Sequence, residues 1–170
     1  MLTFRAWLEA KYWGKEGAGC IAIARFDKTG NPSGKILIGF RSANVVKPNL
    51  CWATFGGAIR GIKGEIEMSP QKGAEREFRE ETKYAGPIEE MIHVYTDVQS
   101  NFQYHNFIAI IPQEFQPILN WENEKSHWFS SWKEIVSATP QHPGFTRMLR
   151  AARPIIFDLV RSIRSKSLAS

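Results

Sequence analysis

The sequence predicts an α/β sandwich in which a mixed sheet lies between helices, with residues 1–170 forming a single domain. Strand-like apolar runs flank a central acidic segment of helical spacing, and the chain ends in a long amphipathic segment. Strands and helices in this order favour a sheet covered by helices on both faces. With 43% hydrophobic residues, the chain is long enough to bury about 70% of its unfolded surface in one core.

The first two strands are predicted as a hairpin. Residues 17–26 contain the uninterrupted apolar run Cys20–Ala24, which indicates a strand buried on both faces. A turn cluster at 27–34 leads to a second strand at 35–41. Further strands are expected at 52–55, 91–98, 104–111 and 127–130.

Helices are predicted near the start, in the middle and near the end of the chain. Residues 4–13 form a short amphipathic pattern, and another short helix is expected at 132–136. The acidic segment 76–83 also has helical spacing. Its helix is expected to end near Gly86, since glycine adopts the left-handed cap and Pro87 cannot continue a helix.

The C-terminal segment combines an apolar stripe with basic side chains. Its apolar residues follow the spacing of an amphipathic helix from Phe145 to Ile163, and Pro154 is expected to kink that helix or to start a new one. The basic residues are Arg147, Arg150, Arg153, Arg161, Arg164 and Lys166. We interpret them as the solvated face of the helix, with a nucleic-acid footprint as the alternative.

Three carboxylates are predicted to share one face of the acidic helix, because Glu77, Glu80 and Glu81 stand at i, i+3 and i+4. At about 4 Å each like-charge pair costs roughly 1 kcal/mol in water and about 4 kcal/mol at an effective dielectric of 20. A divalent cation relieves this repulsion, and carboxylate oxygens suit Mg²⁺ or Mn²⁺. The alternative is a solvated helix face balanced by Arg76, Arg79 and Lys83.

The pair Gly56-Gly57 follows an apolar, aromatic run at 52–55. Glycine permits close backbone approach and unusual dihedral angles, so a backbone carbonyl at this pair can turn toward a bound ion. A strand, a glycine turn, a loop and an acidic helix together favour a metal site over a plain charged surface.

These residues resemble the Nudix hydrolase family. The family's box contains a glycine, an early glutamate and then Arg-Glu-apolar-x-Glu-Glu-x-Gly on a loop-helix-loop. The matching positions are Gly57, Arg76, Glu77, Phe78, Glu80 and Glu81. The resemblance implies an α/β/α sandwich of the Nudix type with a mixed central sheet.

Three features depart from the family pattern. The loop after Gly57 is about five residues longer, an insertion of small entropic cost. Met68 occupies the position of the early glutamate, with Glu65 and Glu67 close by, and Lys83 replaces the closing glycine. The carboxylates that the chemistry requires are all present.

The resemblance implies the roles of the box residues. Glu77 and Glu81 are the expected principal ligands of Mg²⁺, with Mn²⁺ as an alternative cation, and the Gly56 carbonyl is a backbone ligand. Glu80 is expected to be a ligand or the general base. Arg76 is expected to orient the carboxylates by charge-assisted hydrogen bonds.

Residues outside the box complete the expected site. A further acid of the family often comes from a later loop before an aromatic strand, a place that Glu122 and Glu124 occupy here. Either is a candidate metal ligand or base, and two solvated loop acids are the alternative. Arg41, at the end of the second strand, is a candidate phosphate contact or a solvated surface residue.

The implied reaction is metal-dependent hydrolysis of the diphosphate bond in a nucleoside diphosphate linked to another group. A mononucleotide-type small molecule is the expected substrate, and an RNA 5′ end is the alternative, for which only the basic tail argues. Two other classes stay open: a nucleotide-binding module without turnover, and an isoprenoid diphosphate isomerase, for which Cys51 alone argues. A Cys51→Ala change distinguishes the isomerase from a hydrolase, since a hydrolase should keep its activity.

Composition limits partners and compartment. The net charge of +5 and the pI near 9.3 favour anionic ligands such as phosphates. No apolar run approaches the ~18 residues that span a bilayer, and residues 1–9 lack a signal peptide's apolar core. We therefore expect a cytoplasmic protein without a membrane partner, either a monomer or a homodimer. Cys20 and Cys51 lack metal-ligand spacing and are expected to be free thiols.

Histidines and aromatic residues are expected to be mainly structural. His93, His105, His127 and His142 show no paired ligand spacing. Five aromatic residues are candidates for stacking on a base, of which one or two are expected to line a pocket. They are Trp52, Phe55, Tyr95, Tyr104 and Phe107.

Overall fold

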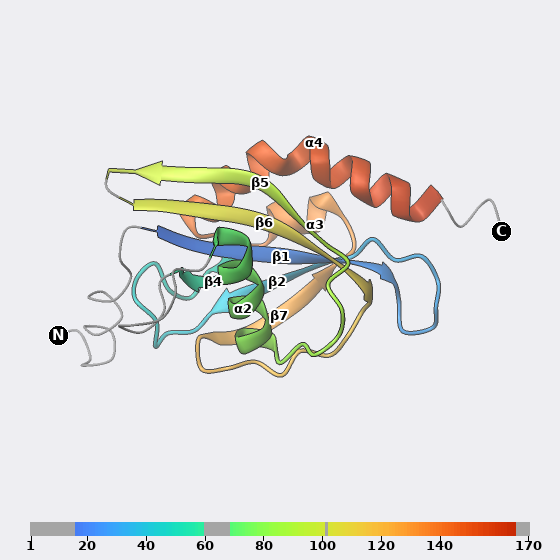
Figure 1. Ribbon diagram of the computed structural model, residues 1–170, viewed down its shortest axis with the longest axis horizontal. Helices are drawn as coiled ribbons and strands as arrows, with labels where there is room; N and C mark the ends of the chain where they lie inside the picture. Colours follow the sequence, from blue (N-terminus) through green and yellow to red (C-terminus); the bar gives the residue numbers. More distant parts are fainter. Residues whose placement is uncertain (1–15, 60–68, 101, 166–170) are drawn as a thin grey trace.

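The computed structural model describes residues 16–59, 69–100 and 102–165. Figure 1 shows a twisted sheet with α4 over one face and α2 against the other. The strands are β1 (Glu16–Phe26), β2 (Ile36–Arg41), β3 (Trp52–Ala53), β4 (Phe55–Ala58), β5 (Glu90–Gln99), β6 (Phe102–Gln113) and β7 (Asn123–Phe129). The helices are α2 (Pro70–Thr82), α3 (Trp132–Ser137) and α4 (Pro143–Ser165).

The sheet is mixed, as predicted. Its main path runs β3-β2-β1-β6-β5, with β4 also paired to β1 and β7 to β2. β1 and β6 pair in parallel and the other pairs are antiparallel. The predicted hairpin is confirmed, since Ala22 lies opposite Leu37 and Ile23 opposite Ile36.

Each face of the sheet has its own apolar core. Alternate residues of β1 point to opposite faces, so Ile21 and Ile23 pack against Ile135 of α3 and Met148 of α4. The alternate residues Cys20, Ala22 and Ala24 of β1 lie on the other face, which α2 covers and where Phe78 is fully buried. The α/β/α sandwich expected from the sequence is therefore the observed fold.

The strand predictions hold with one change. Residues 52–55 form two short strands, β3 and β4, and the second continues through the glycine pair to Ala58. β3 pairs with β2, whereas β4 pairs with β1. Gly56 and Gly57 are therefore strand residues. The helix predicted at 4–13 lies outside the described residues.

The prediction for the end of the acidic helix was wrong. α2 begins at Pro70, is capped by Ser69, whose side chain accepts a hydrogen bond from the Lys72 amide, and ends at Thr82. Lys83 takes the left-handed cap at φ 58° and donates its N–H to the Arg79 carbonyl. Gly86 is not among the described residues with positive φ. Lys83 thus performs the capping role expected of a glycine.

Pro154 does not start a new helix, because α4 continues through it as one element from Pro143 to Ser165. No helix within the described ranges is long and apolar enough to span a membrane.

Candidate functional site

The site is built on the outer edge of β4. Gly56 lies opposite Gly19 of β1, yet its N–H turns away from β1 and donates to Glu81 Oε1 at 2.6 Å. In an extended strand the N–H and C=O of one residue point to the same edge. The Gly56 carbonyl therefore faces the same side as α2. Two residues on, the Ala58 carbonyl accepts a hydrogen bond of 2.9 Å from Arg76 on this same edge.

Glu77 lies against Gly57, on the face of β4 that α2 covers. A Cβ on Gly57 would stand 2.7 Å from both Cδ and Oε1 of Glu77, so this approach requires glycine. Arg76 binds Oε1 of Glu77 at 2.6 Å and both oxygens of Glu80 at 3.3 Å. Arg76 thus joins two carboxylates of α2 to the backbone of β4.

Burial and mutual repulsion disfavour the charged forms of both inner carboxylates. Burial raises the pKa of Glu77 to about 7, aided by Glu122 and Glu80 and opposed by Arg76. Burial also raises the pKa of Glu81 well above its usual range, with Glu122 and Glu77 adding to the rise. The hydrogen bonds from Asn123 and Gly56 act in the opposite direction. A cation placed here would favour the charged forms of Glu77 and Glu81 and offset their mutual repulsion.

Of the two later acids, the structure brings Glu122 to the cluster. Glu122 precedes β7 and raises the pKa of both inner carboxylates. The side-chain amide of Asn120 donates to the Glu122 carboxylate at 3.1 Å. The backbone N–H of Asn120 donates to the Glu81 carbonyl at the end of α2. Glu124 is exposed on β7, and side chains alternate along a strand, so Glu124 points away from its buried neighbour Asn123.

Asn123 is a site residue that the sequence argument missed. It is buried and its side-chain amide donates to Glu81 Oε2. Strand alternation places Asn123 and Glu124 on opposite faces of β7, but the local sequence does not show which of the two faces inward.

Glu80 occupies the outer position of the acidic face. Its side chain is 55% exposed and forms an ion pair with Arg76, whereas Glu77 and Glu81 are buried. The predicted shared face of three carboxylates is thus graded in depth, with Glu81 innermost and Glu80 in contact with solvent.

The donor set fits a hard divalent cation. Within the described ranges, no three His, Cys, Asp or Glu side chains converge on one point. Mg²⁺ does not need such a cage, because it commonly binds through one or two carboxylates, keeps several waters and takes phosphate oxygens from the substrate. Glu77 and Glu81 supply two carboxylates, and the Gly56 carbonyl supplies a further oxygen beside them.

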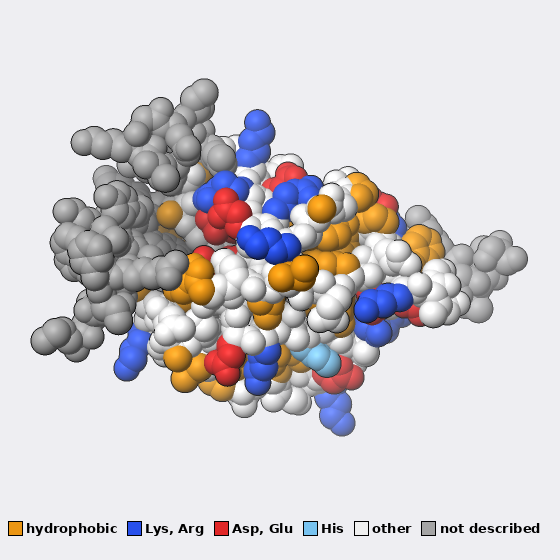
Figure 2. Space-filling view, turned by 90° about the horizontal axis from the view of Figure 1, so that it is seen from below, with side chains coloured by type: hydrophobic (Ala, Val, Ile, Leu, Met, Phe, Trp, Pro, Cys, Tyr) orange, Lys and Arg blue, Asp and Glu red, His pale blue; other side chains and the backbone are white. Residues whose placement is uncertain are grey.

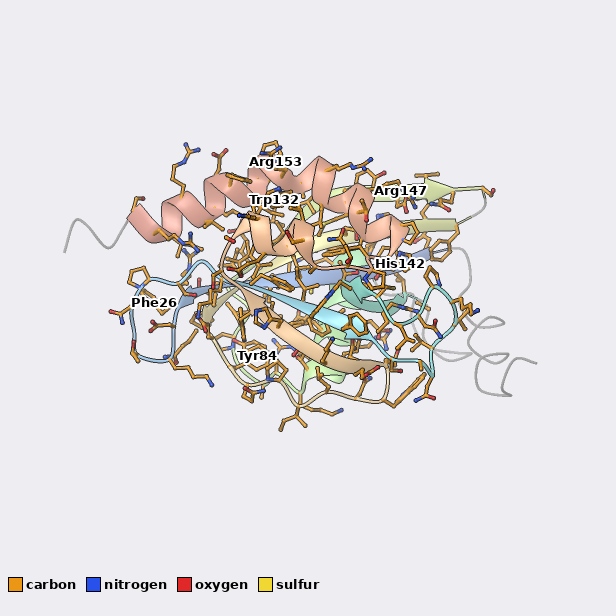
Figure 3. All side chains as sticks on the ribbon, turned by 180° about the vertical axis from the view of Figure 1, so that it is seen from behind. Phe26, Tyr84, Trp132, His142, Arg147 and Arg153 are labelled. Atoms are coloured by element: carbon orange, nitrogen blue, oxygen red, sulfur yellow. The ribbon has the colours of Figure 1, made fainter. Side chains whose placement is uncertain are left out.

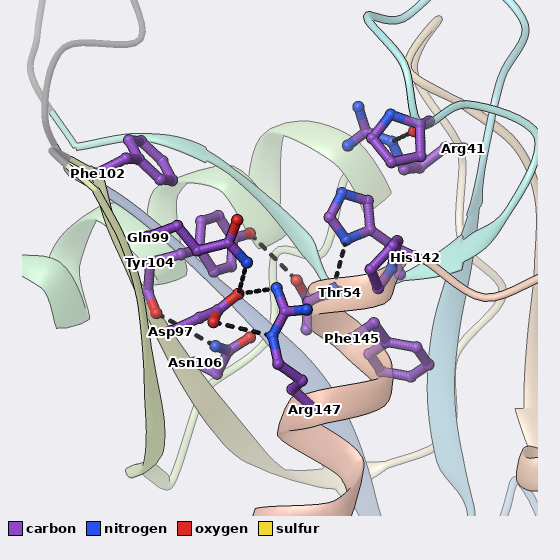
Figure 4. A pocket seen from close by; sticks show the side chains of 14 residues that line it. Arg41, Thr54, Asp97, Gln99, Phe102, Tyr104, Asn106, His142, Phe145 and Arg147 are labelled. Atoms are coloured by element: carbon purple, nitrogen blue, oxygen red, sulfur yellow. Dashed lines mark hydrogen bonds and ion pairs between the residues drawn. The ribbon is translucent and has the colours of Figure 1, made fainter.

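A pocket of about 330 Å³ opens on the other face of the sheet, between β5, β6 and the start of α4 (Figure 4). Its size lies within the range of small-molecule sites. Both aromatic rings and polar groups line it. Its lining includes Arg41, Thr54, Asp97, Gln99, Phe102, Tyr104, Asn106, His142, Phe145 and Arg147.

The polar groups of the pocket are held by a fixed network. Arg147 donates to both oxygens of Asp97, at 3.0 and 2.6 Å, a bidentate pair that fixes both side chains. His142 Nδ1 accepts from the Gly144 amide at 3.1 Å, so its proton sits on Nε2. Burial, Arg41 and Arg147 lower the pKa of His142 to about 4. His142 is therefore a neutral hydrogen-bond donor at pH 7, a role that its isolated position in the sequence did not reveal.

Arg41 lines the pocket, but its guanidinium also supports the loop after β2. It donates to the carbonyls of Pro48 and Val46 at 2.9 and 3.1 Å. Its positive charge lowers the pKa of His142. Arg41 thus contributes charge to the pocket from a tethered position.

Tyr104 is the one stacking candidate of the five that lines this pocket. Phe55 and Phe107 belong to the core beneath α2, and Trp52 and Tyr95 pack against the core beneath α4. Phe102 and Phe145 line the pocket without having been predicted. Alternation along β6 explains the difference, since Tyr104 and Phe107 lie on opposite faces.

The basic residues of α4 are mostly engaged within the protein. Arg147 binds Asp97, Arg161 lies 3.8 Å from Asp158, and Arg164 donates to two backbone carbonyls. Arg153 stacks over Trp132 beside α4, far along the helix from His142 (Figure 3). These contacts of the α4 side chains favour the solvated-face interpretation of the helix. On the face of the molecule opposite α4, charges of both signs are interspersed (Figure 2).

Both cysteines are buried free thiols, as expected. Cys51 donates to the Pro48 carbonyl, and burial raises its pKa. Within the described ranges, the Cys51 thiol makes no hydrogen bond to the carboxylates of α2.

The raised pKa of Glu77 predicts a pH dependence of stability in the absence of metal. A carboxyl with a folded-state pKa near 7 and an unfolded value near 4.5 stabilises the fold fully below pH 4.5, and this contribution is lost as the pH rises through 7. Urea unfolding with chelator should show the wild type losing on the order of 3 kcal/mol relative to Glu77→Gln between pH 4.5 and pH 8. Parallel pH curves for the two proteins would contradict the placement of Glu77.

Comparison with known proteins gives a fold but no close relative. No family model and no curated protein matches the chain. Among solved structures, a Nudix hydrolase from M. smegmatis, RenU, is 22% identical with a TM-score of 0.63, covering 86% of this chain and 89% of that one. A C. elegans Ap4A hydrolase is 15% identical with a TM-score of 0.59, covering 85% and 98%. The NUDIX domain of Shewanella oneidensis NrtR, complexed with ADP ribose, is 13% identical with a TM-score of 0.57, covering 84% and 88%.

The chain is therefore an α/β/α sandwich whose acidic helix presents carboxylates to a glycine-containing strand edge. Its fold is that of the Nudix hydrolases. The identities are all low, so the likeness establishes the fold, and the activity must be argued from the site.

Proposed function

We propose that this protein is a metal-dependent hydrolase that cleaves the diphosphate bond of a nucleoside diphosphate linked to another group. The observation that carries the proposal is the placement of Glu77 and Glu81, two buried carboxylates of raised pKa, against Gly56 and Gly57 of β4. Buried like charges at one backbone edge are unfavourable without a cation.

The residues divide into ligands, an orienting residue and a solvent-facing acid. Glu77, Glu81 and the Gly56 carbonyl would hold Mg²⁺ or Mn²⁺, with Glu122 as the further acid. The bound cation supplies charge that neutralises diphosphate oxygens and acidifies water. Arg76 fixes the carboxylates of Glu77 and Glu80 relative to β4. Glu80 is the acid of the helix that meets solvent, so we assign it the removal of a proton from attacking water.

The pocket supports a mononucleotide-type small molecule as substrate. Tyr104 and Phe102 offer aromatic surface for a base, and Asp97, Gln99 and Asn106 offer polar groups along its edge. Arg41 adds positive charge. Solved structures of this fold include one complexed with ADP ribose and one complexed with AMP and a Mn ion. An RNA end is less well supported, because most basic side chains of α4 have partners within the protein.

The test is release of phosphate, pyrophosphate or AMP from nucleoside triphosphates, ADP-ribose, nucleotide sugars and dinucleoside polyphosphates, with Mg²⁺, with Mn²⁺ and with chelator. We expect turnover of at least one class that stops when the metal is removed. Folded protein that binds nucleotides without turnover under all conditions would instead indicate a binding module.

A further inference from the structure

The side chain of Tyr104 crosses β1 along a path that glycines keep open. A Cβ on Gly17 would lie 2.8 Å from Tyr104 Cδ2, and a Cβ on Gly19 would lie 2.3 Å from its hydroxyl oxygen. No side chain larger than hydrogen fits at these positions while Tyr104 lies there. The ring reaches from β6 toward β4 and forms part of the pocket lining (Figure 4).

The hydroxyl of Tyr104 ends against the Gly56 backbone. A Cβ on Gly56 would lie only 2.1 Å from that oxygen. The hydroxyl also shares a hydrogen bond of 3.1 Å with Thr54 Oγ1. Burial raises the pKa of Tyr104, so the phenol keeps its proton and remains a neutral hydrogen-bonding group.

The Gly56–Gly57 segment is therefore held from two sides. On the side of α2, the Gly56 amide donates to Glu81 and the Glu77 carboxylate lies against Gly57. On the pocket side lies the hydroxyl of Tyr104. Tyr104 thus lines the pocket and also lies against the Gly56–Gly57 backbone that the carboxylates of α2 contact.

We infer that Tyr104 is a positioning residue, which holds the Gly56–Gly57 backbone in register with Glu77 and Glu81 from the floor of the substrate pocket. Where turnover is concerned, this inference rests on the proposed function. A base stacked on the ring restricts Tyr104 further, so occupancy of the pocket and the geometry of the carboxylate site are linked through a single backbone segment.

Tyr104→Phe tests the inference because it keeps the ring and removes only the hydroxyl. Tyr84→Phe is the matched control, since the Tyr84 hydroxyl donates to the Pro87 carbonyl at 2.8 Å, away from the glycine pair. Amide hydrogen exchange is measured by NMR without ligand, with the buried Ile108 as the internal reference. We expect the Gly56 amide to exchange about fivefold to tenfold faster in Tyr104→Phe, with Ile108 unchanged and Tyr84→Phe like the wild type. Equal exchange at Gly56 in all three proteins would overturn the inference.

Kinetics on the substrate found for the wild type give the second readout. In Tyr104→Phe we expect kcat to fall about tenfold while KM stays within about twofold, whereas Tyr104→Leu should also raise KM because it removes the ring. A raised KM with unchanged kcat in Tyr104→Phe would contradict positioning, because it would place the hydroxyl on the substrate. If the wild type turns over no substrate, the proposed function fails, and the exchange at Gly56 still decides the role of Tyr104.

Discussion

Glu81→Gln is expected to reduce metal-dependent hydrolysis by about 10³-fold or more while leaving the fold intact. The loss follows because a bound cation contributes several kcal/mol of transition-state stabilisation, and each 1.36 kcal/mol corresponds to tenfold in rate. The fold should persist because burial raises the pKa of Glu81 and so disfavours its charged form, and glutamine resembles the neutral acid. Activity and thermal unfolding with chelator are the measurements, and the midpoint should stay the same or rise.

Glu75→Gln is the control for this prediction. Glu75 lies on the same helix and pairs with Arg79 at 3.0 Å, so the same substitution there changes a partly exposed ion pair only. We expect near wild-type activity. Full activity of folded Glu81→Gln, or an equal loss in Glu75→Gln, would be inconsistent with the assigned site.

Gly56→Ala is expected to destabilise the protein by roughly 3 kcal/mol or more, the upper end of the overpacking range. The added Cβ would lie 2.5 Å from the Ala18 carbonyl oxygen and 2.6 Å from Gly19 Cα, both backbone atoms of β1, besides the Tyr104 hydroxyl. Backbone in the middle of a sheet cannot move aside as the end of a flexible side chain can. Chemical unfolding of the variant measures the loss.

Gly73→Ala is the matched control in α2. A Cβ at Gly73 would meet Ile59 at 3.4 Å or more, which is ordinary contact, and alanine is favoured over glycine within a helix by roughly 0.5–1 kcal/mol. We therefore expect Gly73→Ala to be neutral or stabilising. Equal effects of the two substitutions would show that the close approach at Gly56 has no special energetic role.

Most of the sheet could be predicted because its strands have strong local patterns. The apolar run Cys20–Ala24 is buried on both faces, and the glycine-rich turn after it does produce a hairpin. The end of α2 was not predictable from residue preference, since Lys83 adopts a conformation for which glycine is favoured. The helix ends there because Lys83 adopts the left-handed conformation, and the distant Ile118 and Asn120 amides bind the Thr82 and Glu81 carbonyls, contacts that local sequence preference does not show.

The candidate site was predictable only where its residues are close in sequence. Helical spacing placed Glu77 and Glu81 on one face, and the glycine pair indicated close backbone approach. Spacing did not rank the acids by depth, because the position of β4 decides which carboxylate is buried. The pocket depends on β5, β6 and α4 meeting, so Asp97 and Arg147, fifty residues apart, carry no shared local signal.

A crystal grown with Mn²⁺ tests the central claim most directly, because anomalous scattering locates the metal without reference to any substrate. We predict a peak at the edge of β4, within about 2.0–2.3 Å of Glu81, Glu77 and the Gly56 carbonyl oxygen, and its absence in Glu81→Gln. An edge without metal in the wild type at saturating Mn²⁺, or a peak bound only to other acids, would contradict the assignment of Glu77, Glu81 and Gly56 as the metal site.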